Sequence, residues 1–225
     1  MPTGLTRSNI ALGAVGLAFV VFIVALVAGS LTRPEVATFI PSPAEPREVG
    51  DAAVGPLTYT VDARSPEDWV YFDFSRGSVV ETAGPPALDW DIAFRRHRMI
   101  TNGGDTNPLG QAGVAELSAV PLDSTTVVPE EGFVTDERRG DESRNRALES
   151  WYDYSWLSHI LEPADRVYAV RTADGRYAIL RFVGYYCPGG QSGCVTFRYR
   201  YRGDGARRFA VAPASGICIV CAQPQ

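Results

Sequence analysis

Four cysteines are the residues of this chain whose spacing points most directly to chemistry. Cys187 and Cys194 flank the short segment Pro-Gly-Gly-Gln-Ser-Gly between two expected strands, so their Cβ atoms can come within disulfide distance. Cys218 and Cys221 have two residues between them, and a bridge there requires a turn because an extended chain holds them too far apart. An even number of cysteines in a head outside the cytoplasm favours disulfides.

Two other kinds of cysteine site are compatible with these positions. A zinc site made by all four would have six, then 23, then two intervening residues, and the first spacing is longer than zinc usually prefers. Cys218 and Cys221 also form a CxxC pattern, but no βαβ pattern surrounds it. We therefore expect disulfides and no metal site.

Catalytic signatures are missing from the sequence. It has no HExxH, no GxSxG, no glycine-rich phosphate loop and no histidine beside an obvious nucleophile. It also has no lysine, which excludes Schiff-base chemistry and a phosphate-loop lysine. The loop Asn102-Gly-Gly-Asp105 offers oxygen atoms to a cation, but this composition is more typical of a turn. We predict that the chain is not an enzyme.

The charge balance argues against nucleic acid as a partner. The net charge is -5, and the arginines alternate with aromatic residues instead of forming a basic stripe. A phosphate backbone would on average be repelled, so we expect no nucleic-acid binding.

An apolar segment near the N-terminus predicts a membrane helix. Residues 10–31 are almost unbroken in apolar character, and at 1.5 Å per residue a helix of this length spans a hydrocarbon core of roughly 30 Å. The alternative is a cleaved signal peptide, whose apolar part is usually shorter, about 7–15 residues. No cysteine lies near the segment, so a lipid-modified cysteine is not available as an anchor. We expect an uncleaved anchor.

Small residues recur along this segment at spacings of three and four. Such a face lets a second helix approach closely in lipid, although alanine and glycine are common in membrane helices anyway. We therefore expect transmembrane helices of other subunits, together with lipid, as partners. The predicted packing face consists of Ala11, Ala14, Ala18, Val21, Ala25 and Ala28.

The rest of the chain predicts a tether and a head. Residues 1–9 form a short tail, residues 32–56 contain five prolines and predict a semi-extended tether, and residues 57–225 are long enough for a core of their own. Counting positive charges on the two sides of the helix gives nearly a tie, so orientation rests on the cysteines. We expect a single-pass protein of the inner membrane with its C-terminal domain in the periplasm.

The sequence of the head predicts antiparallel strands. In 195–202 the aromatic residues Phe197, Tyr199 and Tyr201 alternate with Thr196 and arginines, which is the period of a half-buried sheet. Asp174-Gly175 between two apolar runs predicts a hairpin. Three other regions are expected to differ: a long loop over 101–113, a solvated excursion over 129–146, and one short helix or turn within 147–161.

The order and spacing of several segments resemble the HmuY-like family. The resemblance covers residues 68–202 and implies an extracytoplasmic, all-β antiparallel fold, here joined to one N-terminal transmembrane α-helix. The segments that carry it are Trp69-Val-Tyr-Phe-Asp-Phe, Trp90-Asp-Ile-Ala-Phe-Arg-Arg with Thr101-Asn-Gly-Gly, Trp151-Tyr-Asp-Tyr, Val167-Tyr-Ala-Val-Arg-Thr-Ala-Asp-Gly-Arg-Tyr and Val195-Thr-Phe-Arg-Tyr.

The resemblance also implies haem as a possible cofactor, because the best-known members hold its iron between two histidines. This chain contains two histidines, His97 and His159, so these are the candidate haem ligands, with Met99 as a weaker substitute. Each histidine is more typical of a surface or capping residue. Our expectation is therefore that no cofactor is needed, with haem as the alternative.

Two functions follow from these observations. The first is an accessory or structural subunit of a larger membrane complex, with a respiratory or photosynthetic complex as a reasonable host. The second is a haem- or tetrapyrrole-binding protein of the HmuY type.

Overall fold

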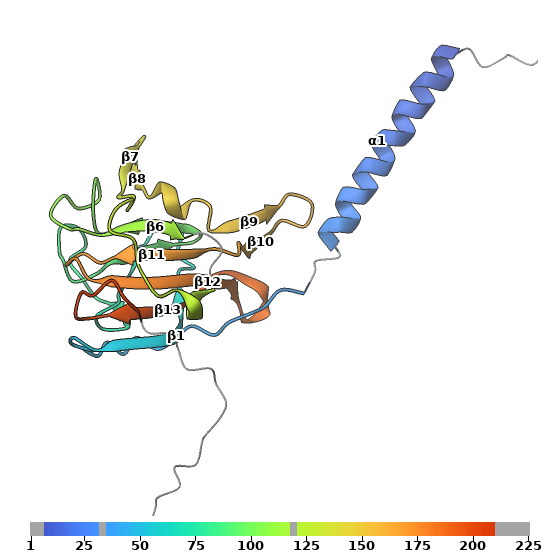
Figure 1. Cartoon of the computed structure of the whole chain (residues 1–225). Helices are drawn as coiled ribbons and strands as arrows, with labels where there is room; N and C mark the ends of the chain where they lie inside the picture. The colour runs from blue at the N-terminus through green and yellow to red at the C-terminus, as the bar shows by residue number, and fades with distance from the viewer. Residues whose placement is uncertain (1–6, 32–34, 118–120, 210–225) are drawn as a thin grey trace, which may run out of the picture.

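The structure is a computed structural model that describes residues 7–31, 35–117 and 121–209. Figure 1 shows a long helix, α1 (Arg7–Leu31), standing apart from a β-rich body. The strands of the body are β1 (Ala53–Asp62), β2 (Val70–Asp73), β3 (Ser78–Val80), β4 (Ile92–Arg95), β5 (Arg98–Thr101), β6 (Gly113–Leu117), β7 (Glu137–Arg139), β8 (Glu142–Arg144), β9 (Tyr152–Ser155), β10 (Ile160–Pro163), β11 (Val167–Arg171), β12 (Tyr177–Cys187) and β13 (Gln191–Arg202). Three short 3-10 turns accompany them: η1 (Leu122–Ser124), η2 (Arg146–Leu148) and η3 (Pro188–Gly190).

Two sheets form the body. One has the strand order β1-β13-β12-β11-β6 and the other β3-β2-β4-β5, and every paired strand in them is antiparallel. The pairs β7–β8 and β9–β10 are separate hairpins. The predicted all-β antiparallel fold with one N-terminal helix is confirmed.

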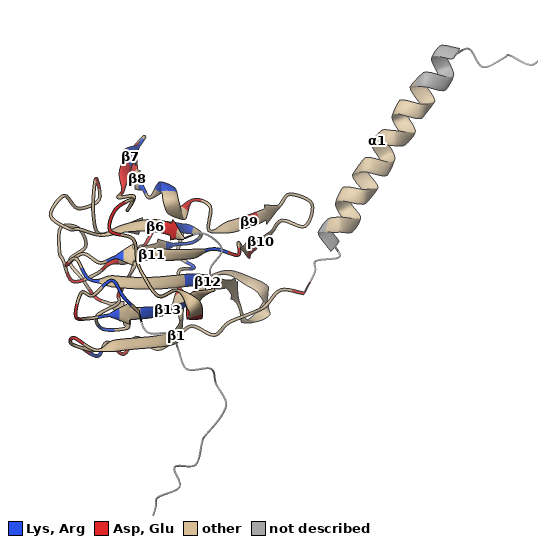
Figure 2. Cartoon of the chain, in the orientation of Figure 1, with Lys and Arg blue, Asp and Glu red and all other residues tan. Residues whose placement is uncertain are grey.

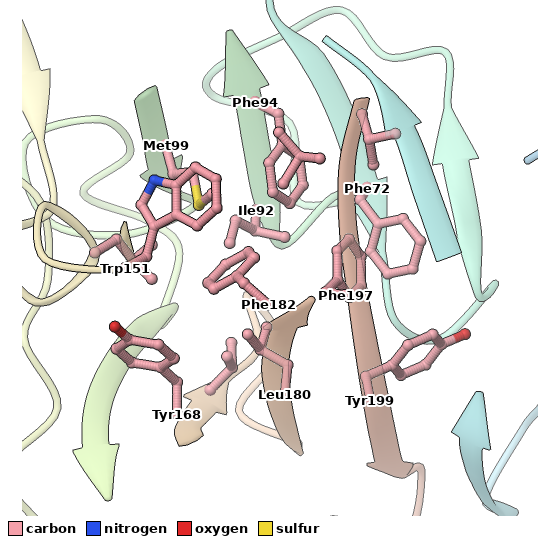
Figure 3. Packing of buried hydrophobic residues seen from close by; sticks show 14 of the residues in the cluster. Phe72, Ile92, Phe94, Met99, Trp151, Tyr168, Leu180, Phe182, Phe197 and Tyr199 are labelled. Carbon is pink, nitrogen blue, oxygen red and sulfur yellow. The ribbon is translucent and has the colours of Figure 1, made fainter. Parts of the chain in front are cut away.

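The core lies between the two sheets and is rich in aromatic rings. Figure 3 shows side chains of β2 and β4 meeting those of β12 and β13. The Phe72 and Phe197 rings meet edge to face at 5.2 Å, and the Phe94 and Phe197 rings stack at 5.7 Å. Such ring pairs add stability beyond the area that they bury.

The alternating residues of strand β13 pack on both faces of the larger sheet. Phe197, Tyr199 and Tyr201 are buried, as the alternation predicts. The opposite face is less exposed than predicted, because Arg200 is also buried there and donates to the carbonyl of Thr125 at 3.1 Å. A second apolar cluster covers this outer face, with members from β6, η1, β11 and β12 together with Val128 and Phe209.

A disulfide closes the turn between β12 and β13. Cys187 and Cys194 are bonded, with Cα atoms 5.0 Å apart. This confirms the predicted pairing and removes both thiolates from a four-cysteine zinc site. Cys218 and Cys221 lie outside the described residues.

Helix α1 begins at Arg7, three residues before the predicted start, and ends at Leu31 as predicted. Its window Leu12–Gly29 has a mean hydropathy of 2.7 and no buried residue, so it is long and apolar enough to cross a membrane. Ala14, Ala18, Ala25 and Ala28 are all exposed on it, whereas the side chain of Ala11 lies outside the described part.

The proline-rich segment after the helix is in contact with the head. Thr38 forms an isolated parallel bridge with Tyr186, and the Ser42 amide donates to the carbonyl of Thr60 at 2.9 Å. Strand β1 begins at Ala53, inside the stretch 32–56 that we expected to be a tether. Residues 38–42 therefore contact both β12 and β1 of the larger sheet.

Of the three regions singled out in the sequence, one differs from its expectation and one agrees only in part. The segment 147–161 holds the end of η2 and most of the β9–β10 hairpin, where one short helix or turn was expected. The loop 101–113 is organised by buried amides: Asn102 and Asn107 are fully buried and joined to each other at 2.7 Å. The charged stretch 129–146 carries the β7–β8 hairpin, in which β7 is exposed and β8 is half-buried, so it is a solvated excursion only in part, because Asp136 and Asn145 are buried.

Candidate functional site

A cleft of about 360 Å³ opens beside the β4–β5 hairpin. Its walls come from β5, from the β7–β8 hairpin, from η2 and from the first residue of β9. The lining residues are Trp69, His97, Arg98, Met99, Arg139, Glu142, Ser143, Arg144, Asn145, Leu148, Glu149 and Tyr152. This cleft contains one of the two histidines and is the best candidate for a ligand site on the head.

His97 lines the cleft from the two-residue turn of the β4–β5 hairpin. Its carbonyl accepts a hydrogen bond from the indole Nε1 of Trp151 at 2.9 Å, and its ring meets the ring of Tyr152 at 5.7 Å. Partial burial lowers the pKa of His97, and the neighbouring Arg98 and Arg96 lower it further. The imidazole is therefore neutral at neutral pH and keeps a lone pair for a metal ion.

A buried carboxylate, Asp136, is hydrogen-bonded to Asn145 of the cleft lining. Asp136 accepts hydrogen bonds from the Thr101 hydroxyl at 2.6 Å, from the Thr106 hydroxyl at 2.6 Å and from the Asn145 amide at 3.0 Å. Burial raises the pKa of Asp136, and these hydrogen bonds oppose the rise. The network joins β5, the loop after it and the residue that follows β8, so it fixes the distance between the two sides of the cleft.

Acidic residues partner the arginines at the rim. Glu142 pairs with Arg95 at 2.6 Å and with Arg98 at 2.5 Å. Glu149 lies 3.3 Å from Arg139 and 3.8 Å from Arg144. An anionic ligand would therefore compete with two carboxylates for these guanidinium groups.

His159 lies elsewhere, in the turn of the β9–β10 hairpin. Its Nδ1 is 2.7 Å from the hydroxyl of Tyr154, and its backbone is left-handed, with φ 55°. It is not among the residues that line the cleft. The structure therefore places the two predicted haem ligands on different hairpins.

The donor set of the cleft does not fit a haem held between two histidines. Such a site needs two imidazoles facing one iron, and the described cleft has His97 alone. Met99 also lines the cleft, but the residue is only 6% exposed and packs in the core beside Trp151 (Figure 3), so we do not count it as a second ligand. Within the described residues, no three side chains of His, Cys, Asp or Glu gather as a metal site.

Comparison with known proteins decides the family. The family model described as "HmuY protein" matches residues 65–199, which is more than half of the chain. The chain belongs to the HmuY family. The matched range agrees closely with the residues 68–202 over which the sequence resembles it.

Solved structures share the HmuY fold with this chain. An apo HmuY analog from Tannerella forsythia has a TM-score of 0.54 and 16% identity, over 69% of this chain and 99% of that one. A candidate lipoprotein from Bacteroides fragilis has a TM-score of 0.51 and 22% identity, over 68% and 93%. A candidate HmuY-like heme-binding protein from Bacteroides vulgatus has a TM-score of 0.50 and 22% identity, over 68% and 97%. No curated protein matches the sequence.

The sequence did not reveal two buried carboxylates, Asp91 and Asp136, whose hydrogen bonds join separate segments of this HmuY-family head. Asp91 is buried and accepts hydrogen bonds from the amides of Phe74 at 2.9 Å and Ala173 at 2.8 Å, and burial raises its pKa to about 8. Asp136 joins segments 35 residues apart. In the sequence both resemble surface acids, and only the fold brings their partners to them.

Proposed function

We propose that this HmuY-family chain is a membrane-anchored, non-catalytic subunit of a larger membrane complex. In this proposal α1 spans the inner membrane once and holds the head on the periplasmic side. The observation that carries it is the exposure of α1: no residue from Leu12 to Gly29 is buried by the head. Lipid and the helices of other subunits are the environments that cover such a surface.

The alanine residues indicate which side of α1 would face a partner helix. Ala14, Ala18, Ala25 and Ala28 share one side of α1, where small side chains allow a neighbouring backbone to come close. The disulfide in the head supports an oxidising compartment for it. A respiratory or photosynthetic complex is the host class that we favour.

Purification of the full chain in mild detergent tests this proposal. We expect the chain to migrate in native gels with a complex much larger than its own 24.4 kDa, and mass spectrometry then identifies the partners. Enlarging the small face with Ala18→Leu and Ala25→Leu should release the chain from that complex. Val20→Leu with Val27→Leu, on the other side of the helix, is the matched control and should leave it bound. A wild-type chain that migrates alone contradicts the proposal.

The cleft at His97 favours a second candidate function, the binding of haem or another tetrapyrrole through one imidazole. Its support is a neutral histidine beside Tyr152 and Trp69, with arginines at the rim that carboxylates of a tetrapyrrole could contact. A bound haem would supply an iron that accepts the His97 nitrogen as a ligand. The residues that would hold it are His97, Arg98 and Arg144.

Absorbance titration with haem separates the two candidates. Binding through the cleft predicts a Soret shift that His97→Ala abolishes and His159→Ala preserves. If the shift needs both histidines, the single-imidazole site is wrong. If the wild-type chain gives no shift, the second candidate is removed and the first is unaffected.

A further inference from the structure

The tip of the β9–β10 hairpin lies against the end of the apolar helix. The Cγ atom of Leu157 is 3.2 Å, and its Cδ1 atom 3.3 Å, from the position that a Cβ atom on Gly29 would take. Gly29 is the last residue of the apolar window of α1. Figure 1 shows the same arrangement, with the hairpin extending from the body toward the end of the helix nearest to it. If α1 spans a bilayer, the hairpin tip therefore lies beside the point where the helix leaves it.

Large apolar side chains are exposed at this tip. Tyr154 is 56% exposed, Trp156 is 64% exposed and Leu157 is 43% exposed, all within four residues. Elsewhere on the described head, exposed large apolar residues such as Leu88 and Leu109 are well separated in the chain. Scattered residues of that kind are normal on a protein surface, whereas a group of them indicates a binding surface.

The tip also carries no charge. Residues 154–161 read Tyr-Ser-Trp-Leu-Ser-His-Ile-Leu, without Asp, Glu, Lys or Arg. The β7–β8 hairpin is the opposite case, because Glu and Arg fill it, and Figure 2 shows the contrast between the two. Two hairpins of one head thus have opposite surface chemistry, and the uncharged one is the one beside the helix.

Polar groups of the tip bond to one another. The Ser158 hydroxyl donates to the Ser155 hydroxyl at 2.8 Å, and Tyr154 and His159 share a hydrogen bond of 2.7 Å. Groups that are already paired cost less to remove from water. The tip can therefore enter a less polar environment without leaving these side chains unsatisfied.

Helix α1 lacks the aromatic residues that usually mark a membrane interface. Between Arg7 and Leu31 it has no Trp and no Tyr. In membrane proteins these two residue types are enriched at the headgroup level, where the ring is apolar and its polar atom stays hydrated. Tyr154 and Trp156 provide both types at the end of the helix, on a different segment of the chain.

We propose that the β9–β10 tip, residues 154–159, docks into the interfacial layer of the bilayer at the point where α1 emerges. Trp156 and Leu157 enter the boundary between headgroups and acyl chains, and Tyr154 and His159 stay at headgroup level. For comparison, amphipathic helices that lie in this layer bury their apolar face about 5–10 Å into that boundary. The docking would fix how the head stands on the membrane, and it rests on the proposed membrane span of α1.

Tryptophan quenching by brominated lipid tests the docking. The full chain is placed in phosphatidylcholine vesicles in which some lipids carry bromine near the headgroup end of the acyl chains. The chain has four tryptophans and none is in α1, while Trp90 and Trp151 are fully buried. We expect quenching in the wild type, its loss in Trp156→Phe and its retention in the matched control Trp69→Phe.

Carbonate extraction of the same vesicles separates this proposal from the one on which it rests. If the chain resists extraction and Trp156→Phe is quenched as strongly as the wild type, the docking is wrong and the anchor stands. If carbonate releases the chain, the anchor is wrong and the docking falls with it.

Discussion

The ring of Phe39 occupies the space in which a side chain on Gly184 would begin. A Cβ atom at Gly184 would lie 2.1 Å from Cε2 of Phe39, far inside van der Waals contact. Next to this contact, the Phe39 amide donates to the carbonyl of Tyr186 at 2.8 Å. The segment that leads from the helix is thus seated on β12, close to the disulfide that ends this strand.

The first prediction follows from this contact. Gly184→Ala should push the Phe39 ring off β12 and increase thermolysin cleavage within residues 35–48 several-fold. Phe39→Ala should do the same, and the double variant should be no more sensitive than either single one, because both remove one contact. Gly16→Ala is the matched control, since nothing lies within 4 Å of a Cβ atom there. Wild-type resistance in Gly184→Ala would contradict this account.

The disulfide should stabilise the head measurably. Cys187 and Cys194 are seven positions apart. Closing a loop of this length lowers the conformational entropy of the unfolded chain, which stabilises the folded state by about 2–3 kcal/mol. We expect Cys187→Ala with Cys194→Ala to lower the free energy of unfolding by that amount in urea titrations. A background lacking Cys218 and Cys221 prevents thiol exchange. An unchanged midpoint would show that the bridge does not form or does not contribute.

The buried carboxylate of Asp136 should contribute more to the stability of the head than an exposed acid does. Asp136→Asn keeps the shape but replaces one acceptor oxygen by a donor, so the Thr106 hydroxyl or the Thr101 hydroxyl loses its partner. We expect a loss of about 2–3 kcal/mol in the free energy of unfolding. Asp141→Asn, at an exposed position of the neighbouring hairpin, should change it by less than about 0.5 kcal/mol. Equal effects of the two substitutions would refute the role of the network.

Buried acids give the head an unusual pH dependence. Burial raises the pKa values of Asp73, Asp91 and Asp136 above 3.8, and for Asp91 the value is about 8. Between the unfolded and folded pKa values the folded state binds more protons, so stability rises as pH falls through this window. We expect the melting temperature of the chain in detergent to fall as pH increases from 5 to 8.

Asp91→Asn tests the source of that slope. It should flatten the dependence, because the amide does not ionise. A melting temperature that rises from pH 5 to pH 8, or a slope that Asp91→Asn leaves unchanged, would contradict the assignment.

Much of the fold was predictable because it depends on local pattern. The alternation of Phe197, Tyr199 and Tyr201 predicts an inward face, and those three rings are buried. Asp174-Gly175 predicts the hairpin between β11 and β12, where the chain turns. Residues 10–31 predict a helix from composition alone, and α1 ends at the predicted residue.

The rest depends on contacts that the sequence does not display. The alternating pattern of β13 does not predict that η1 and Phe209 cover its outer face and bury Arg200. The two histidines are 62 positions apart, and only the fold shows that one lines the cleft and the other does not. The β9–β10 hairpin was missed because its aromatic residues also suit a short helix, and pairing with β10 decided the outcome.

Protease accessibility in spheroplasts tests the central claim most directly, namely that α1 anchors an HmuY-family head outside the cytoplasm. The full chain carries one tag at each end, and protease is added from outside before and after lysis. We predict that external protease destroys the C-terminal tag while a membrane-bound fragment containing α1 keeps the N-terminal tag until lysis. A C-terminal tag protected in intact spheroplasts, or a soluble mature head that lacks α1, would contradict the account.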